Sequence, residues 1–522
     1  MDRPHRVEPA ERDRSQARSL HVAWAALVVA LVIVHCALPL HRPVPKDTMF
    51  TGGKMLLSWA ELLEDTRQNP FPPLFFVAMK AWCSVAGVSL AALLAPGAVA
   101  SVLTPCVFAW ALRPWITNPW TRWLAAALAG VHLVAVLHGS EIAKPYAELR
   151  LLAAFGAGAW IRVLEAAAGG RSTRGWTLGF AAACVVGCQL HFPGLFLPGV
   201  VAAHAMLFVR RDPRLRRAAW SAVAVLAVSG GSVLVWTERM RTRLVDGAGL
   251  AWVEGTRPPG GVLVAVVTDL KAMCTGADVP TFDLRRPWET AAAVAVVILA
   301  GAGIAWLAAR GRRPLLGLGG ALIVIAIVLP VAALVLLEPI RPLYFGRYVA
   351  VLLLPIAAAC AVAAERTVTR SGRWAGAAVA LALVGGRVAG LATAETGGPP
   401  RGVCAKYIDA VRTAEGCGAT LVVLPRSFRH ETWTRWIDHE GGPPPSGLRI
   451  DWSGPEGVAA AIEGHRRALV VPPSRRFDPS VLGLPPGWRT TRVGPVVVRT
   501  GSGAFRKCAA PAFVLVERRD AR

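Results

Sequence analysis

The sequence has too little charge for a soluble protein. Only 17% of its 522 residues are charged and 7% are aromatic, whereas 54% are hydrophobic. An ordinary globular domain carries about 25% charged residues. The apolar excess is aliphatic and falls in long runs, a pattern typical of helices that face lipid. The composition therefore excludes a soluble enzyme and indicates a polytopic membrane protein.

Acidic residues are also scarce. The chain has 57 Lys and Arg against 33 Asp and Glu, a formal net charge of +24. Such an excess is typical of nucleic-acid-binding proteins. Here, however, the basic residues cluster in short connections between apolar runs, where they orient helices toward the cytoplasm. We therefore expect no nucleic-acid partner.

About eleven apolar runs are candidate membrane spans. They cover residues 21–40, 92–112, 122–138, 147–164, 176–189, 195–209, 218–236, 288–309, 315–337, 346–364 and 374–392. Arg-rich connections occur at every second turn, at 113–122, 169–174, 210–217, 310–313 and 365–373. The positive-inside rule places these connections, and the polar tail 1–20, in the cytoplasm. The other connections then face outward.

The first outer loop, 41–91, contains a further apolar stretch at 72–95. Reading this stretch as a span would invert the side of every later loop and place the Arg-rich connections outside. We therefore predict a helix that lies in the outer interface, with Lys80 and Trp82 at the depth of the lipid headgroups.

The composition changes at residue 393, where Pro and Gly become frequent. Short β-rich runs at 419–425, 467–473, 493–500 and 511–519 alternate with amphipathic segments at 403–414 and 455–467. This alternation predicts a small extracytoplasmic α/β domain over 393–522. An oxidising compartment would favour a disulfide there, and we expect one involving Cys404 and Cys417. The predicted fold class is an all-α polytopic membrane protein with this C-terminal domain.

No familiar soluble catalytic motif is present, so the candidate residues are the ionisable side chains at the outer membrane face. Asp47 follows the first span closely and is either a solvated loop acid or a general base. Glu61, Glu64 and Asp65 follow at helical spacing, and a solvated helical face explains them.

A second outer loop, "LHGSEIAKPYAELR" at 137–150, carries more charge than a short hairpin between spans needs. Glu141, Lys144 and Tyr146 belong to this loop, and such a group either holds an anionic substrate or anchors the interface. His191 lies at the next outer turn, where a lone His beside aromatics is commonly a hydrogen-bonded interface residue. Arg347 lies inside a predicted span, where its fork suits a phosphate.

Together these stretches resemble the GT-C class of polytopic membrane glycosyltransferases, the group of protein O-mannosyltransferases, lipid A aminoarabinose transferases and family 39-like bacterial enzymes. The resemblance covers about residues 20–365. It rests on four strings in the family's order: Asp47 with Thr48 and then "PPLFFVAMKAWCSVAG"; Ser140, Glu141, Lys144, Pro145 and Tyr146; His191 and Phe192; and Arg347, Tyr348, Leu354 and Pro355. Thr48 stands where the family has a second acid, and Lys144 stands where it has Arg.

The resemblance implies transfer of a sugar from a polyprenyl phosphate to an acceptor lipid, glycan or protein outside the cytoplasm, with inversion. It implies catalytic roles for Asp47 and Glu141. The donor phosphate would contact Lys144, Arg347 and Lys54, and the substrates would contact Tyr146, His191 and Tyr348. Neither a cofactor nor a metal is expected, since no acidic pair is present.

Two other classes remain open. An O-antigen-ligase-like or polymerase enzyme also uses a lipid-linked donor, and the long segment 237–287 fits its late outer loop. A secondary transporter would keep its charges near the midplane and often shows inverted repeats, neither of which is visible here. We expect an integral protein of a bacterial inner membrane, with a cytoplasmic N-terminus and an extracytoplasmic C-terminal domain.

Overall fold

The computed structural model describes residues 9–37, 39, 46–68, 72–132, 135–140, 142–245, 314–337, 351–371, 410, 413–414, 416–417, 419–423, 449–451, 458–462, 465–470, 482, 484–486, 488–493 and 513–518. The chain divides into two compact units. The first comprises Met1–His41, Leu63–Ala81 and Leu94–Thr396, and the second comprises Arg42–Leu62, Trp82–Leu93 and Gly397–Arg522.

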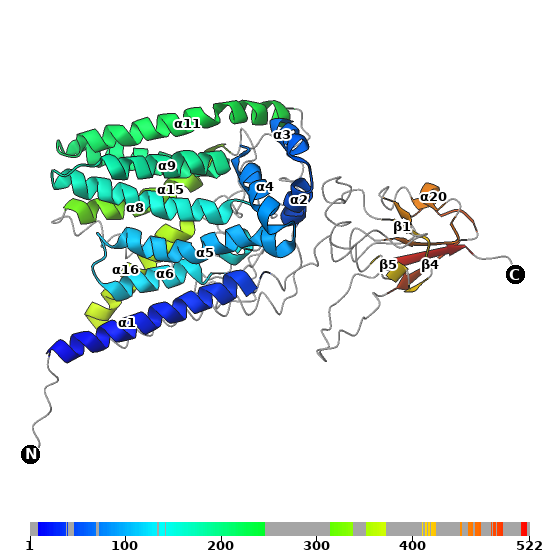
Figure 1. Ribbon diagram of the computed structural model, residues 1–522, viewed down its shortest axis with the longest axis horizontal. Coiled ribbons are helices and arrows are strands. Elements are labelled where there is room, and N and C mark those ends of the chain that lie inside the picture. Colours follow the sequence, from blue (N-terminus) through cyan, green and yellow to red (C-terminus); the bar gives the residue numbers. More distant parts are fainter. Residues whose placement is uncertain are drawn as a thin grey trace, which may run out of the picture. The chain divides into compact units, whose positions relative to one another are not determined.

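The first unit is a helix bundle (Figure 1). Its elements in chain order are α1 (Pro9–Val32), the π-helix η1 (Ile33–Ala37), α6 (Pro119–Gly130), the π-helix η3 (Val136–Ser140), α8 (Tyr146–Ala168), α9 (Arg174–Leu190), the 3₁₀-helix η4 (Phe192–Leu195), α10 (Phe196–Leu207), the 3₁₀-helix η5 (Val209–Arg211), α11 (Arg216–Val245), α15 (Pro314–Leu337) and α16 (Leu353–Ser371). Three further helices cross the boundary between the units: α3 (Trp59–Gln68), α4 (Leu74–Ala86) and α5 (Leu90–Leu112).

Five of the described helices are apolar and long enough to cross a bilayer. They are Ala17–Ala37, Leu90–Leu112, Tyr146–Ala168, Phe192–Arg211 and Arg216–Leu234. The Arg-rich connections between α5 and α6, α8 and α9, and α10 and α11 all lie at one end of the bundle (Figure 1). The structure is thus that of an integral membrane protein, and these three connections share one side, as the sequence predicted.

Three predicted segments differ in the structure. The run 122–138 is not one helix, because α6 ends at Gly130 and the chain continues into η3. Gly130 is packed so tightly that an added Cβ would lie 2.5 Å from both Leu31 and Pro105. The stretch 72–95 is divided between α4 and α5 at Gly87, whose φ of 79° favours glycine. The tip of α1 becomes π-helical at Ile33. The predicted spans 288–309 and 374–392 lie outside the described residues.

Small residues and two polar contacts hold the bundle core together. Gly158 of α8 lies against Trp110 of α5, and the guanidinium of Arg162, one turn further along α8, stacks 3.6 Å from the Trp110 ring centroid. The Arg162 side chain also donates to the Trp110 carbonyl at 2.9 Å. The second polar contact involves His204 of α10. It receives a hydrogen bond from Trp160 Nε1 of α8 (3.3 Å) and donates through Nε2 to the Leu318 carbonyl of α15 (2.9 Å).

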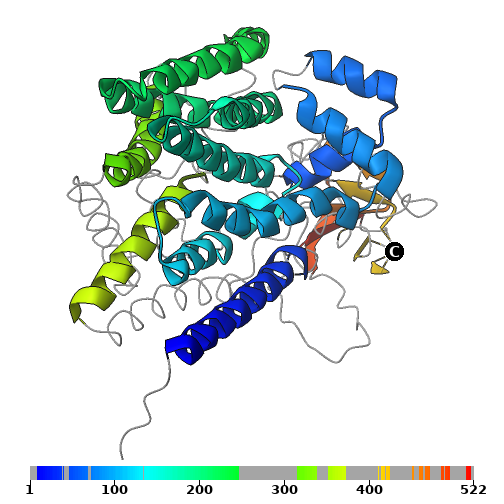
Figure 2. The same cartoon turned by 60° about the vertical axis from the view of Figure 1, so that its left-hand side comes forward.

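These contacts connect α8 to α5, α10 and α15. Figure 2 shows α16 running beside α6, where the two helices pack together. Helices from α5 through α16 therefore share one apolar core. Helix α1 packs through a second, smaller cluster, in which its Leu27 and Leu31 meet residues of α5 and α6.

The second unit contains α2 (Lys46–Met55) and a mixed five-stranded sheet of order β2-β1-β3-β5-β4. The strands are β1 (Leu421–Val423), β2 (Arg449–Asp451), β3 (Arg467–Val470), β4 (Trp488–Val493) and β5 (Phe513–Arg518), and the short helix α20 (Val458–Ala461) contributes to the apolar core. Strands β2, β1 and β3 are parallel, and β5 joins β3 and β4 antiparallel. The sequence did not predict β2, and β4 overlaps the predicted run 493–500 only at Val493; the rest of that run lies outside the described residues.

Two side chains of this unit are informative, Glu517 for the strand register and Cys417 for the expected disulfide. Glu517 of β5 is nearly buried and pairs with Arg467 and Arg489 of the two neighbouring strands, an arrangement that fixes the register. Cys417 has a free thiol, contrary to the expected disulfide, and Cys404 lies outside the described residues.

The contact between α5 and α8 yields the first prediction. A Cβ on Gly158 would lie 2.6 Å from the Trp110 ring and 3.0 Å from the Ala111 backbone, whereas a Cβ on Gly199 in α10 meets nothing within 4 Å. Gly158→Ala should lower the stability of the detergent-solubilised protein by about 1–3 kcal/mol because the two helices must separate. Gly199→Ala should be neutral or slightly stabilising. Equal thermal unfolding of the two variants would contradict this packing.

Candidate active site

A buried histidine joins three elements at the end of the bundle opposite the Arg-rich connections. His35 of η1 donates through Nε2 to the Gly130 carbonyl at 2.9 Å, because a carbonyl only accepts. Its Nδ1 must then accept the hydroxyl proton of Ser140 in η3, also at 2.9 Å. Both nitrogens of the neutral ring are used, so His35 connects the Ser140 side chain of the second outer loop to the end of α6.

Arg150 holds the same loop from α8. Its side chain is only 3% exposed, and Nη2 donates to the Ala135 carbonyl (2.9 Å) and the Ser101 hydroxyl (3.3 Å). Gly139 leaves the space for this guanidinium, since a Cβ there would overlap Nη2 of Arg150. The buried Nε has no hydrogen-bond partner. A buried cation with an unused donor is costly and marks a candidate anion site.

Three of the predicted site residues lie together: Lys144, Tyr146 and His191. Lys144 Nζ lies 5.3 Å from the ring centroid of Phe76 in α4, and its charge acts on His191. The His191 ring lies 5.6 Å from the ring of Tyr146, centroid to centroid. The structure thus brings together Phe76 of the first outer loop, the second outer loop and the turn after α9.

Burial sets the chemistry of His191. The side chain is 7% exposed, at the extended residue between α9 and η4. Burial, together with the smaller effect of the positive charge of Lys144, lowers the pKa of His191 to about 3. The imidazole is therefore neutral at physiological pH and a weak base. It is suited to hydrogen bonding and ring contact with a substrate rather than to proton abstraction.

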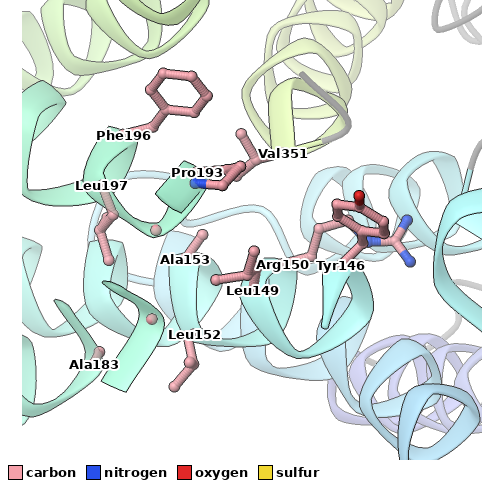
Figure 3. Close-up of a pocket in the computed structure, with 12 residues that line it drawn as sticks. Tyr146, Leu149, Arg150, Leu152, Ala153, Ala183, Pro193, Phe196, Leu197 and Val351 are labelled. Atoms are coloured by element: carbon pink, nitrogen blue, oxygen red, sulfur yellow. The ribbon is translucent and has the colours of Figure 1, made fainter. Parts of the chain in front are cut away.

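A pocket opens beside these residues (Figure 3). Its cavity volume is about 30 Å³, so the pocket is narrow. Helix α8 contributes Tyr146, Leu149, Arg150, Leu152 and Ala153, and the facing wall comes from Ala183, Gly187, Pro193, Gly194, Phe196, Leu197 and Val351. Tyr146 and Arg150 are its polar lining residues, so the pocket combines one cation and one phenol with an apolar wall.

A second cavity, of about 100 Å³, shares four lining residues with this pocket: Ala153, Phe196, Leu197 and Val351. Its lining is nonpolar and comes from α5, α8, α10, α15 and α16, with Leu354 and Pro355 among its members. The two spaces together are amphipathic, with polar groups near Arg150 and hydrocarbon walls deeper in the bundle.

Asp47 and Lys54 belong to the second unit, on α2. They are seven residues apart, two helical turns, and so lie on one face of the helix. Asp47 is half-buried in the first turn, and Lys54 is 1% exposed in the last, with Nζ 4.6 Å from the Phe50 ring centroid. If this face of α2 were simply solvated, both side chains would be exposed. The half-buried acid and the buried cation therefore do not fit that interpretation.

The acids after α2 have structural roles. Glu61 Oε2 accepts the Ser58 amide at 2.7 Å, and the Ser58 hydroxyl accepts the Glu61 amide at 3.2 Å, which forms a capping box for α3. Glu64 pairs with Arg67 at 3.3 Å on an exposed surface. This agrees with the expected solvated helical face and makes Glu64 a suitable control position.

The remaining predicted site residues, Glu141, Arg347 and Tyr348, lie outside the described residues. Sequence reasoning did not select Arg150 as a site residue, although Arg150 is the last residue of the charged loop 137–150. The missing signal was Gly139, whose lack of a side chain is required by Arg150 eleven residues later. Among the described residues, no three His, Cys, Asp or Glu side chains are grouped to hold a metal.

The pKa of His191 yields the second prediction. Its folded value of about 3 lies below the ordinary value of about 6.5, so the unfolded chain binds the proton first as the pH falls. The stability that His191 contributes is complete above pH 6.5 and is lost between pH 6.5 and 3, by up to about 2 kcal/mol at pH 5. His191→Asn should lose less stability than wild type between pH 7 and 5. His21→Asn, at an exposed position, should follow wild type in thermal unfolding; equal pH slopes for all three proteins would contradict the assignment.

Comparison with known proteins places this arrangement in a known fold. No family model matches the chain, and no curated protein matches it significantly. Among solved structures, ArnT from Cupriavidus metallidurans bound to undecaprenyl phosphate has a TM-score of 0.51 at 14% identity over 94% of this chain and 97% of its own. AglB, the oligosaccharyltransferase of Archaeoglobus fulgidus, in complex with an inhibitory peptide and a dolichol-phosphate, has a TM-score of 0.53 at 12% identity over 87% and 69%. The chain therefore has the fold of the GT-C class of membrane glycosyltransferases.

Proposed function

We propose that this protein is a membrane glycosyltransferase that moves a sugar from a polyprenyl-phosphate donor to an acceptor lipid, glycan or protein outside the cytoplasm. The observation that carries the proposal is the amphipathic space beside α8. A pocket with Arg150 and Tyr146 adjoins a nonpolar cavity, the combination that a phosphate on a long hydrocarbon requires. The fold, shared with a protein solved with undecaprenyl phosphate, supports the same donor class.

The donor phosphate would contact cations at the outer end of the bundle. Arg150 supplies a buried guanidinium whose Nε is unused, and its fork matches phosphate oxygens. Lys144 lies at the same end, near Tyr146 and His191. Arg347 and Lys54 remain the further proposed phosphate contacts. In a water-poor site such cations stabilise the charge that develops on the departing polyprenyl phosphate.

The transfer needs a base on the acceptor side. The acceptor oxygen or nitrogen attacks the anomeric carbon, the bond from that carbon to the phosphate oxygen breaks, and the acceptor proton passes to Asp47. Inversion follows from attack opposite the leaving group. His191 is too weak a base for this step because burial lowers its pKa to about 3, so we assign it, with Tyr146 and Tyr348, to substrate contact. Glu141 is the second proposed catalytic acid.

This reaction sets the orientation in the membrane. The donor and acceptor meet at the end of the bundle opposite the Arg-rich connections, so that end faces away from the cytoplasm. The N-terminus is then cytoplasmic, and the C-terminal domain is extracytoplasmic in a bacterial inner membrane.

Asp47→Asn tests the proposed base. The substitution preserves size and much of the hydrogen bonding while removing basicity, so expression and membrane insertion should be unchanged. Transfer from an undecaprenyl-phosphate sugar should fall about 10²- to 10⁴-fold. Glu64→Gln, which removes an exposed acid of the neighbouring helix, should retain the wild-type rate. If Asp47→Asn transferred at near-wild-type rates while Glu141→Gln abolished transfer, the base would be Glu141.

Arg150→Lys tests the donor site. Lysine keeps the charge but lacks the fork that reaches Ala135, Ser101 and a phosphate together. The KM for the donor should rise about 10- to 100-fold, as expected for loss of a hydrogen bond to a charged group. Arg171→Lys, at an exposed position after α8, is the matched control. An unchanged donor KM in Arg150→Lys would exclude Arg150 from the phosphate site.

A further inference from the structure

Glu148 and Arg150 are opposite charges on one turn of α8 that attract each other electrostatically but, among the described residues, form no direct salt bridge. They are two residues apart, about 200° around the helix, so their side chains leave on nearly opposite sides. Arg150 faces Ser101, Ala135 and the pocket. Glu148 is absent from the lining of both the pocket and the nonpolar cavity. Each charge must therefore find its partner on its own side of α8.

The carboxyl group of Glu148 is only half satisfied. Glu148 is the third residue of α8, where it accepts its own backbone amide and benefits from the helix dipole. Its Oε2 is inaccessible to solvent and has no hydrogen-bond partner. An unsatisfied buried polar atom costs about 1–3 kcal/mol, more when it is charged. The helix N-terminus thus explains one oxygen and leaves the other unexplained.

The place of Glu148 in the fold indicates which kind of group its Oε2 can bind. Glu148 lies in the helical turn that begins with Tyr146 and directly follows Lys144, at the end of the bundle where the proposed reaction occurs. Glu165, the other acid of α8, lies at the far end of the same helix beside Arg162, whose charge it accompanies. Both acids of α8 therefore interact electrostatically with an Arg of the same helix. Glu148 differs because its buried Oε2 has no hydrogen-bond partner among the described residues.

We propose that Glu148 is a substrate-binding residue whose Oε2 accepts a hydrogen bond from a hydroxyl or ammonium group of a substrate. The inference rests on the proposed glycosyl transfer and deepens it. Because Arg150 and the phosphate pocket lie on the other side of α8, the group that reaches Glu148 belongs to the transferred sugar or to the acceptor, not to the phosphate. Phosphate binding and recognition of the sugar or acceptor are thereby divided between two faces of one helical turn.

The test compares Glu148→Gln with Glu165→Gln in the full-length, detergent-solubilised protein. Binding of undecaprenyl phosphate alone is measured first, followed by transfer kinetics with two donors, undecaprenyl phosphate carrying a neutral hexose and the same lipid carrying an amino sugar. In Glu148→Gln, the affinity for undecaprenyl phosphate and the melting temperature should be unchanged. The KM for the sugar-bearing donor or for the acceptor should rise about 10- to 100-fold.

The pattern of this increase identifies the ligand group. A larger effect on the amino-sugar donor indicates an ammonium partner, an equal effect on both donors indicates a hydroxyl, and an effect confined to the acceptor KM places Glu148 on the acceptor side. Glu148→Asp, which retains a carboxylate on a shorter side chain, should recover part of the lost affinity. Glu165→Gln should match wild type in every KM.

Two results would overturn the inference in different ways. Wild-type values of every KM in Glu148→Gln, with or without a lower melting temperature, would reduce Glu148 to a stabiliser of the α8 N-terminus. Failure of the wild-type protein to bind undecaprenyl phosphate or to transfer either sugar would instead remove the proposed function, and the inference with it.

Discussion

A guanidinium buried at the end of an apolar bundle is the feature on which the proposed site depends. Removing such a charge from water costs several kcal/mol unless hydrogen bonds compensate. Arg150 recovers part of this cost through the Ala135 carbonyl and the Ser101 hydroxyl, which joins α8 to α5 and to the segment before η3. The absence of a side chain at Gly139 makes this geometry possible. The Nε atom remains without a hydrogen-bond partner among the described residues, so this buried cation keeps one unused donor.

The apolar bundle gives this charge its effect. The helices pack through small residues such as Gly158 and through buried hydrogen bonds such as that between Trp160 and His204. Such packing excludes water from the interior and lowers the local dielectric, so the charges at the outer end act strongly on a bound anion. The same exclusion lowers the pKa of His191, which makes this imidazole a weak base and supports the proposal that a carboxylate accepts the proton.

Much of the first unit followed from the sequence, because helices that face lipid must satisfy their backbone internally and so appear as long apolar runs. The predicted runs 147–164 and 218–236 correspond to α8 and α11, and the Arg-rich connections share one end of the bundle. The run 122–138 failed because composition does not record that Gly130 packs against Leu31 and Pro105. Apolar residues continue past this point, but the helix does not.

The sequence by itself determined the membrane class, the sidedness of the Arg-rich connections relative to one another, and the motif residues Lys144, Tyr146 and His191, since each depends on local residue type and spacing. Only the tertiary structure decided that these three converge near Phe76 and that Arg150 is buried beneath them. Such contacts join segments distant in sequence. Whether a polar atom has a partner, as Nη2 of Arg150 does and Oε2 of Glu148 does not, depends on what surrounds it in space, which no residue pattern encodes.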